Sequence, residues 1–260
     1  MRLIADADLH PTTRVVLEDM YRSDTLLGTE SPDPVPLDKL TRIRTRQGKA
    51  IHNFMRAHSV RKSLEIGFAY GFSTIWMLDA LRFLPNSRHI AIDPFERSVW
   101  HGVGLAQVKR LGFDFDFHWI EDCSIHALSD LIRQKERFDF IYIDGNHRFD
   151  DVLVDFYLAD QVLQCGGVIA LDDIWMRSIQ SAAAFIQKNR AYEAVSQSCD
   201  DIMLMLQKQR EDDRTWDHFT PFKVAAEPGL LLGISARALS RLRSGMVKQA
   251  HLWSYLRKGG

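Results

Sequence analysis

Acidic side chains and a histidine stand at two places in the second half of the chain where an apolar run ends. Asp144 and His147 follow one such run, and Asp172 and Asp173 follow the next. Carboxylates held close together are unfavourable, because each raises the pKa of its neighbour. A divalent cation relieves that repulsion, and carboxylate oxygens with waters suit Mg²⁺ or Mn²⁺ better than zinc. We therefore expect Asp144, Asp172 and Asp173 to form a metal site.

His147 stands three residues after Asp144, where a helix is expected to begin. A hydroxyl bound to the metal would lose its proton more easily, and His147 is close enough to act as the general base that takes it. Each acid also has a structural alternative, since Asp173 could cap the next helix and Asp144 could fix a turn. Their convergence on one sheet edge favours the metal site.

A second group of chemically informative residues is a glycine-containing turn near the middle of the first half. Gly67 and Gly71 allow the backbone to turn sharply and to approach a ligand closely. The helix expected after them offers amide donors to an anionic group, and Asp93 could accept hydrogen bonds from ribose hydroxyls. A dinucleotide site would need glycine where the chain has Ala69. The pattern therefore favours S-adenosylmethionine as the ligand.

These residues must be positioned by the elements around them, which alternate between short apolar runs and helix-period segments. The alternation predicts a mostly parallel sheet with helices on both faces, and the carboxyl ends of its strands would share one ligand-binding edge. Gly166 and Gly167 are expected to end the helix that starts near Phe149. A short turn after 192–198 requires the last strand to be antiparallel. The expected parallel strands are 63–66, 89–92, 115–120, 138–143 and 168–171.

The segment 64–74, with the sequence LEIGFAYGFST, resembles the first motif of class I S-adenosylmethionine-dependent methyltransferases. It is most similar to the metal-dependent O-methyltransferase branch, which contains catechol O-methyltransferase-like and macrocin-type sugar O-methyltransferases. The resemblance covers residues 47–206 and implies a Rossmann-like, doubly wound α/β fold, with a seven-stranded, mostly parallel sheet and an antiparallel last strand. The cofactor contacts expected on this basis are Glu65, Gly67, Phe68, Tyr70, Gly71, Ser73, Asp93, Asp122, Cys123, Ser124 and Asp144.

The resemblance also implies an activity: methyl transfer from S-adenosylmethionine to a metal-bound hydroxyl of a small molecule, with His147 as the base. Catechol enzymes of the branch have lysine at this position, whereas some macrolide-sugar enzymes have histidine, which favours a natural-product sugar as acceptor. Aminocoumarin-sugar relatives have an acid where this chain has Asn146, and Asn146 cannot act as a base. Three alternatives stay open: a metal-independent N- or carboxyl-methyltransferase, a non-catalytic S-adenosylmethionine-binding protein, and a hydroxylase on the same scaffold.

The same reasoning divides the chain into three parts. Residues 1–46 are expected to form an N-terminal lid or dimer arm, residues 47–222 the S-adenosylmethionine-binding methyltransferase domain, and residues 223–260 a basic helical tail. A homo-oligomer is left open.

The composition mainly shows which partners and locations are not expected. The formal net charge of −1 gives no general attraction to nucleic acid, so no such partner is expected. The three cysteines, Cys123, Cys165 and Cys199, have neither disulfide nor zinc spacing, which favours a reducing, cytoplasmic location. No apolar run approaches the roughly 20 residues of a transmembrane helix, so no membrane span is expected.

Overall fold

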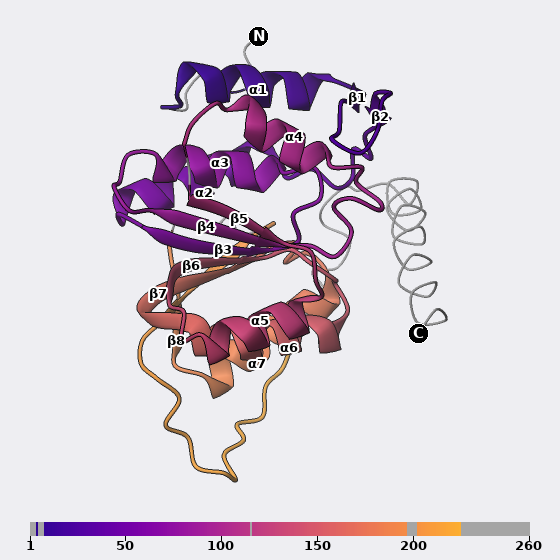
Figure 1. The fold of residues 1–260 in the computed structure, drawn as a ribbon. Helices are drawn as coiled ribbons and strands as arrows, with labels where there is room; N and C mark the ends of the chain where they lie inside the picture. Colours follow the sequence, from indigo (N-terminus) through magenta and orange to yellow (C-terminus); the bar gives the residue numbers. More distant parts are fainter. Residues whose placement is uncertain (1–3, 5–7, 115, 197–201, 225–260) are drawn as a thin grey trace.

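The computed structural model describes residue 4 and residues 8–114, 116–196 and 202–224. Its centre is a seven-stranded sheet in the order β5-β4-β3-β6-β7-β9-β8 (Figure 1). Of the C-terminal tail expected over 223–260, residues 225–260 lie outside the described part of the chain. The strands of this sheet are β3 Lys62–Ile66, β4 Arg88–Ile92, β5 Asp116–Ile120, β6 Phe138–Ile143, β7 Leu163–Leu171, β8 Tyr192–Ala194 and β9 Leu204–Lys208.

Strand direction follows the expected topology. β3, β4, β5, β6 and β7 pair in parallel, whereas β9 is antiparallel to both β7 and β8. Only nine residues, 195–203, separate β8 from β9, fewer than the dozen or more that a parallel crossover needs, which explains the reversal. The structure therefore confirms the mostly parallel seven-stranded sheet with an antiparallel last strand.

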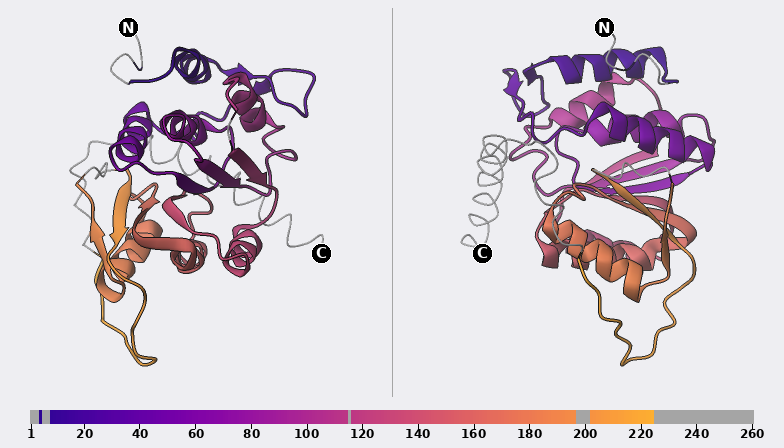
Figure 2. Two further views of the ribbon diagram at one scale, coloured as in Figure 1. Left: turned by 60° about the vertical axis from the view of Figure 1, so that its left-hand side comes forward. Right: turned by 180° about the vertical axis from the view of Figure 1, so that it is seen from behind.

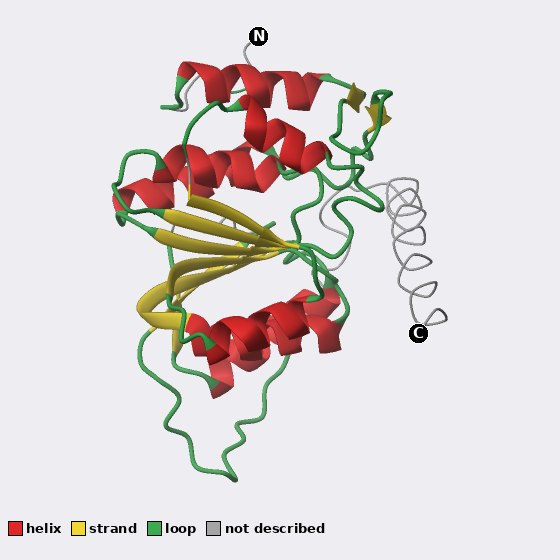
Figure 3. Ribbon diagram, viewed as in Figure 1, coloured by secondary structure: helices red, strands yellow, loops and turns green. Residues whose placement is uncertain are grey.

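Helices cover both faces of the sheet (Figure 3). One face carries α2 Thr45–Ala57, α3 Phe72–Leu81 and α4 Val103–Arg110, and the other carries α5 Ser124–Arg133, α6 Phe149–Val162 and α7 Arg177–Asn189. Because side chains alternate along a strand, Tyr142 packs with the first group of helices and Ile143 with the second. Burial on both faces explains why the strands are almost continuously apolar.

The N-terminal segment adds an outer layer to the first face. Helix α1, Pro11–Arg22, lies outside α3 in each view of Figure 2. The buried Asp79 of α3 fixes it there, since Asp79 accepts a hydrogen bond from His10 N at 3.1 Å and contacts His52 Nε2 at 2.9 Å. The short strands β1 Thr25–Leu26 and β2 Val35–Pro36 form a hairpin beyond this helix.

The predicted end of helix α6 is wrong. The helix ends at Val162, and Gly166 and Gly167 lie inside strand β7. The register between β6 and β7 shifts between Phe138 and Phe140, and Gly166 has φ +81 within the irregular part of β7. Gly166 therefore permits a bulge in strand β7 and does not end a helix.

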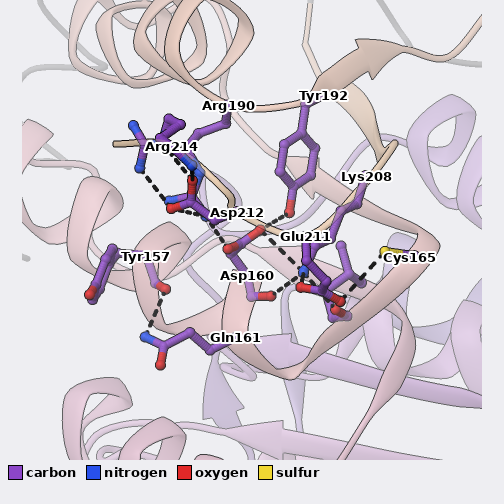
Figure 4. A network of polar contacts seen from close by, with 11 residues as sticks. Tyr157, Asp160, Gln161, Cys165, Arg190, Tyr192, Lys208, Glu211, Asp212 and Arg214 are labelled. Carbon is purple, nitrogen blue, oxygen red and sulfur yellow. Dashed lines mark hydrogen bonds and ion pairs between the residues drawn. The ribbon is translucent and has the colours of Figure 1, made fainter. Parts of the chain in front are cut away.

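A network of charged side chains ties the segment after β9 to α6 (Figure 4). Lys208, only 1% exposed, donates to the carbonyl oxygens of Asp160 and Leu163 and to Glu211. Arg190 pairs with Asp160 and, at 3.3 Å, with Asp212. Buried charges need such partners. The ion pairs fix the segment after β9 at the edge of the sheet opposite the glycine turn.

Candidate active site

The carboxyl ends of β3, β4, β6 and β7 are joined by backbone hydrogen bonds that continue past the strands. Gly67 N donates to Ile92 O, Asp144 N donates to Ile66 O, and Asp172 N donates to Ile143 O, at 2.9 to 3.1 Å. The predicted cofactor turn and both acidic segments therefore lie side by side on one sheet edge, which is where open α/β sheets bind ligands.

Gly67 is required by the closeness of this arrangement. Its φ is +94, a region that other residues rarely adopt, and a Cβ atom here would overlap the carbonyl oxygen of Asp144. The N-cap of α3, Gly71, has φ +80 for the same turn. Gly67 therefore allows the backbone to pass directly against the loop that carries Asp144, whereas Gly71 lies against Gly104 of α4.

Asp93 holds the glycine turn in place. Its Oδ2 accepts hydrogen bonds from Phe68 N at 3.0 Å and Ala69 N at 2.9 Å, and its Oδ1 accepts one from Phe95 N at 2.8 Å. Burial raises the pKa of this carboxyl, and the surrounding N–H groups oppose the rise. Asp93 is where the sequence places a ribose partner, but most of its hydrogen-bonding capacity is already used.

Glu65 and Ser73, both predicted to contact the cofactor, form a hydrogen bond with each other. Glu65 is fully buried and accepts hydrogen bonds from the hydroxyls of Ser73 and Thr74. His89 Nε2 lies 3.4 Å from the same carboxylate. The structure thus shows Glu65 tying strand β3 to the first turn of α3.

The remaining predicted cofactor residues lie around the same edge. The hydroxyl of Tyr70 donates to Pro36 O at 3.4 Å and accepts from Asp38 N at 3.3 Å, so the N-terminal segment reaches the glycine turn. Cys123 is the N-cap of α5, and its N–H donates to Asp122 Oδ1 at 2.7 Å. Phe68 is buried and Ser124 starts α5. Their contact with a cofactor stays a prediction.

Asp144, His147 and Asp173 form a group whose ligand atoms all lie within 4.8 Å of one another. His147 Nε2 is 3.4 Å from Asp144 Oδ1 and 3.1 Å from Asp173 Oδ2, yet makes no hydrogen bond of normal geometry. Asp173 is oriented by Trp175, whose Nε1 donates to Oδ1 at 2.7 Å. The loops after β6 and β7 thus bring two carboxylates and an imidazole together.

Asp172, the third predicted metal ligand, is not brought into this group. Its Oδ1 accepts a hydrogen bond from Gln47 Nε2 at 2.5 Å, and its Oδ2 accepts one from the Tyr142 hydroxyl at 2.7 Å. Strand β7 ends at Leu171, and Asp173 has φ +50, so the backbone turns after the strand and the side chains of Asp172 and Asp173 meet different partners. The sequence reasoning missed both Gln47 and Tyr142, because no local pattern marks contacts between distant segments.

The pKa values of Asp144, His147 and Asp173 are shifted by burial and by the contacts between the three side chains. Burial raises the pKa of Asp144 to about 6, although His147 opposes the rise. Burial alone would lower the pKa of His147, but the carboxylates of Asp144 and Asp173 outweigh it and raise the pKa to about 10. Burial opposes ionisation of Asp173 too, yet His147 holds its pKa below the usual value. Without another cation, the imidazolium supplies the positive charge between the acids.

Comparison with known proteins agrees with this geometry. Residues 64–174 match a family described as a methyltransferase domain. A candidate caffeoyl-CoA O-methyltransferase of Arabidopsis thaliana is 23% identical over 175 residues, which are 66% of this chain and 69% of the relative.

Solved structures show the same fold. An O-methyltransferase from Bacillus cereus, in complex with S-adenosylhomocysteine, has a TM-score of 0.57 and 19% identity, over 77% of this chain and 91% of that one. The methyltransferase PaMTH1 of Podospora anserina, also bound to S-adenosylhomocysteine, has a TM-score of 0.59 and 16% identity, over 79% and 92%. TomG from Streptomyces achromogenes, an O-methyltransferase involved in tomaymycin synthesis, has a TM-score of 0.54 and 18% identity, over 79% and 92%.

The matched domain agrees with the resemblance to class I S-adenosylmethionine-dependent methyltransferases, and the solved structures share the fold. The Arabidopsis relative and TomG are both described as O-methyltransferases, which is the branch that the first motif resembles. None of the helices in the described part of the chain is long and apolar enough to cross a bilayer.

Proposed function

We propose that the protein transfers the methyl group of S-adenosylmethionine to a hydroxyl group of a small molecule, with the help of a divalent cation. The observation that carries the proposal is the direct contact between two loops. Gly67, in the cofactor turn, packs against the backbone of Asp144, which belongs to the acidic group. A methyl donor in the turn and an acceptor at the acids would therefore be neighbours, and such positioning is the main requirement of group transfer.

The acidic group fits a cation such as Mg²⁺ or Mn²⁺. It offers two carboxylates and an imidazole within 4.8 Å, and the buried His147 Nε2 is left without a well-formed hydrogen bond. We assign Asp144 and Asp173 as the residues that would hold the cation. When bound, it would lower the pKa of an acceptor hydroxyl. Asp172 stays a predicted ligand, although its hydrogen bonds to Gln47 and Tyr142 favour a role in fixing the segment that carries Asp173.

His147 is proposed as the general base. Its Nε2 lies between the two carboxylates, where an acceptor hydroxyl drawn to them would also lie. A protonated imidazole cannot accept a proton. His147 can therefore act as the base only when a cation at Asp144 and Asp173 replaces the imidazolium as their counter-charge. The same position would also suit His147 as a ligand, which is the second candidate role.

The N-terminal segment is proposed as a lid over the acceptor side. Tyr70 in the cofactor turn contacts Pro36 and Asp38 of this segment. A hydroxyl-bearing natural product is the acceptor we propose, because one relative is described as a caffeoyl-CoA O-methyltransferase and TomG as an O-methyltransferase involved in tomaymycin synthesis.

Formation of S-adenosylhomocysteine from S-adenosylmethionine, with catechols and sugar-bearing phenols as acceptors, tests the proposal. Turnover should vanish after metal removal with EDTA and return with Mg²⁺ or Mn²⁺. Activity that survives in metal-stripped protein would instead support the metal-independent methyltransferase. Hydroxylation of an acceptor without consumption of S-adenosylmethionine would support the hydroxylase.

A further inference from the structure

Trp175 lies two residues after Asp173, in the turn that follows strand β7, and its side chain is 41% exposed. Its neighbours Ile174 and Met176 pack against the hydrophobic core, whereas Trp175 belongs to no core cluster of the described residues. Its indole Nε1 donates to Oδ1 of Asp173 at 2.7 Å, a distance typical of a hydrogen bond to an ionised acceptor. The polar contact of this side chain is therefore with an acid of the proposed cation site.

The backbone around Asp173 forms a tight turn that is held by two hydrogen bonds. Met176 N donates to the carbonyl oxygen of Asp173 at 2.8 Å, and Ile174 N donates to Ile202 O at 2.8 Å. Asp173 itself has φ +50, and a residue other than glycine keeps this conformation only where its surroundings hold it. The turn therefore fixes where the Asp173 side chain begins, and it places Trp175 within reach of that side chain.

The turn does not fix how the carboxylate of Asp173 is rotated. The last torsion of an aspartate side chain has broad minima, so a carboxylate without partners samples many orientations. Here Oδ1 is bonded to Trp175, while Oδ2 lies 3.1 Å from His147 Nε2, which in turn is 3.4 Å from Asp144 Oδ1. The indole thus occupies one oxygen and leaves the other turned towards the two remaining members of the group.

We infer that Trp175 is a positioning residue for the cation site, because its N–H holds Asp173 with Oδ2 facing Asp144 and His147. The inference rests on the proposed function, which places the cation there. An indole donates a hydrogen bond but has no acceptor, so Trp175 acts only through Asp173 and is not itself a ligand. A partner that orients a ligating carboxylate typically accounts for about 10–100-fold in metal affinity, and we expect that factor for the indole N–H.

Calorimetric titration with Mn²⁺ tests the inference on wild type, Trp175→Phe and Trp175→Gln. Phenylalanine keeps an aromatic ring without the N–H, whereas the glutamine amide carries an N–H at the same number of bonds from Cα without the ring. Trp175→Phe should bind Mn²⁺ about 10–100-fold more weakly, and Trp175→Gln should recover most of that loss. Affinity for S-adenosylhomocysteine and stability in urea should hardly change in Trp175→Phe. A role of the ring in folding alone predicts the opposite order, with Trp175→Phe close to wild type and Trp175→Gln less stable.

Trp216→Phe is the matched control, because it removes the N–H of another exposed indole, in the segment after β9. Its Mn²⁺ affinity should equal that of the wild type. If urea curves show that Trp175→Phe does not fold, Trp175→Leu, which also lacks the N–H, takes its place against Trp175→Gln. Unchanged Mn²⁺ affinity without the N–H, or an equal loss in Trp175→Gln, overturns the inference but not the cation site. Failure of the wild type to bind Mn²⁺ overturns both.

Discussion

Gln47 Nε2 donates a hydrogen bond to Asp172 Oδ1 at 2.5 Å, although 125 residues separate the two in the chain. The bond joins the first turn of α2 to the segment after β7, and both partners are buried. Helix α2, which precedes the cofactor turn, therefore fixes Asp172 through this bond.

Replacing Gln47 by leucine should leave a buried carboxylate oxygen of Asp172 without its partner. The free energy of unfolding should fall by about 1–3 kcal/mol, which is the cost of such an unsatisfied group. Urea denaturation measures the change. Gln164→Leu is the matched control, because Gln164 makes the same amide-to-carboxylate bond to Asp139, also at 2.5 Å, but at an exposed site. Equal losses in the two variants would contradict the importance of burial here.

Gly67→Ala should distort the joint between the cofactor turn and the acidic group. The new Cβ would overlap the carbonyl oxygen of Asp144, and φ +94 is unfavourable for alanine. We expect a loss of about 3 kcal/mol or more in the free energy of unfolding, with weaker binding of S-adenosylhomocysteine. Gly112→Ala has φ +66 but nothing within 4 Å of the new Cβ, so it should cost only about 1 kcal/mol. Comparable stability of the two variants would refute the close-contact explanation.

His147→Ala separates the base from the ligand. As a base, His147 should account for a loss of about 10²–10⁴-fold in turnover, while Mn²⁺ affinity measured by calorimetry stays within about threefold of wild type. Asp173→Asn should abolish Mn²⁺ binding in the same titration. A His147→Ala variant that loses Mn²⁺ affinity as strongly as Asp173→Asn would assign the imidazole as a ligand.

Glu96 should make the protein less stable as the pH rises. Burial raises its pKa from 4.5 to about 9, with Asp93 and Glu121 adding to the rise. Between those values the folded protein keeps a proton that the unfolded chain has lost, so the free energy of unfolding falls with increasing pH. Glu96→Gln cannot ionise, and its stability relative to wild type should therefore grow from about pH 5 to about pH 9. Urea denaturation across that range checks this, and a constant difference would rule it out.

The buried charges of Figure 4 should depend strongly on Asp160. Asp160→Asn leaves Arg190, which is 5% exposed, without its closest carboxylate and removes a counter-charge near Lys208. We expect a loss of about 3–5 kcal/mol in the free energy of unfolding. Asp213→Asn removes only an exposed ion pair with Arg210, which should cost less than about 1 kcal/mol. A small effect of Asp160→Asn in thermal or urea unfolding would show that the network contributes little.

Much of the fold follows from local sequence. Apolar runs such as that in β6 are buried on both faces, and this is the signal of a parallel strand between layers of helices. The short connection between the last two strands dictates their antiparallel pairing. Once the strands are parallel, the placement of Asp93, Asp144 and Asp173 at one edge follows from topology. The helix end expected at Gly166 failed, because the same residue type serves a strand bulge as readily as a helix end.

Only the tertiary structure decided which of these side chains face one another. The sequence placed Asp172 and Asp173 together, but packing turns the first towards Gln47 and Tyr142 and the second towards His147. It likewise gave no sign that Glu96 would be fully buried, with Leu105 N donating to its Oε1. Periodicity and turn residues act over a few neighbouring positions, so the sequence by itself determines strands, helices and their shared edge. Hydrogen bonds between segments more than 100 residues apart depend on how whole elements pack, and they leave no local pattern to read.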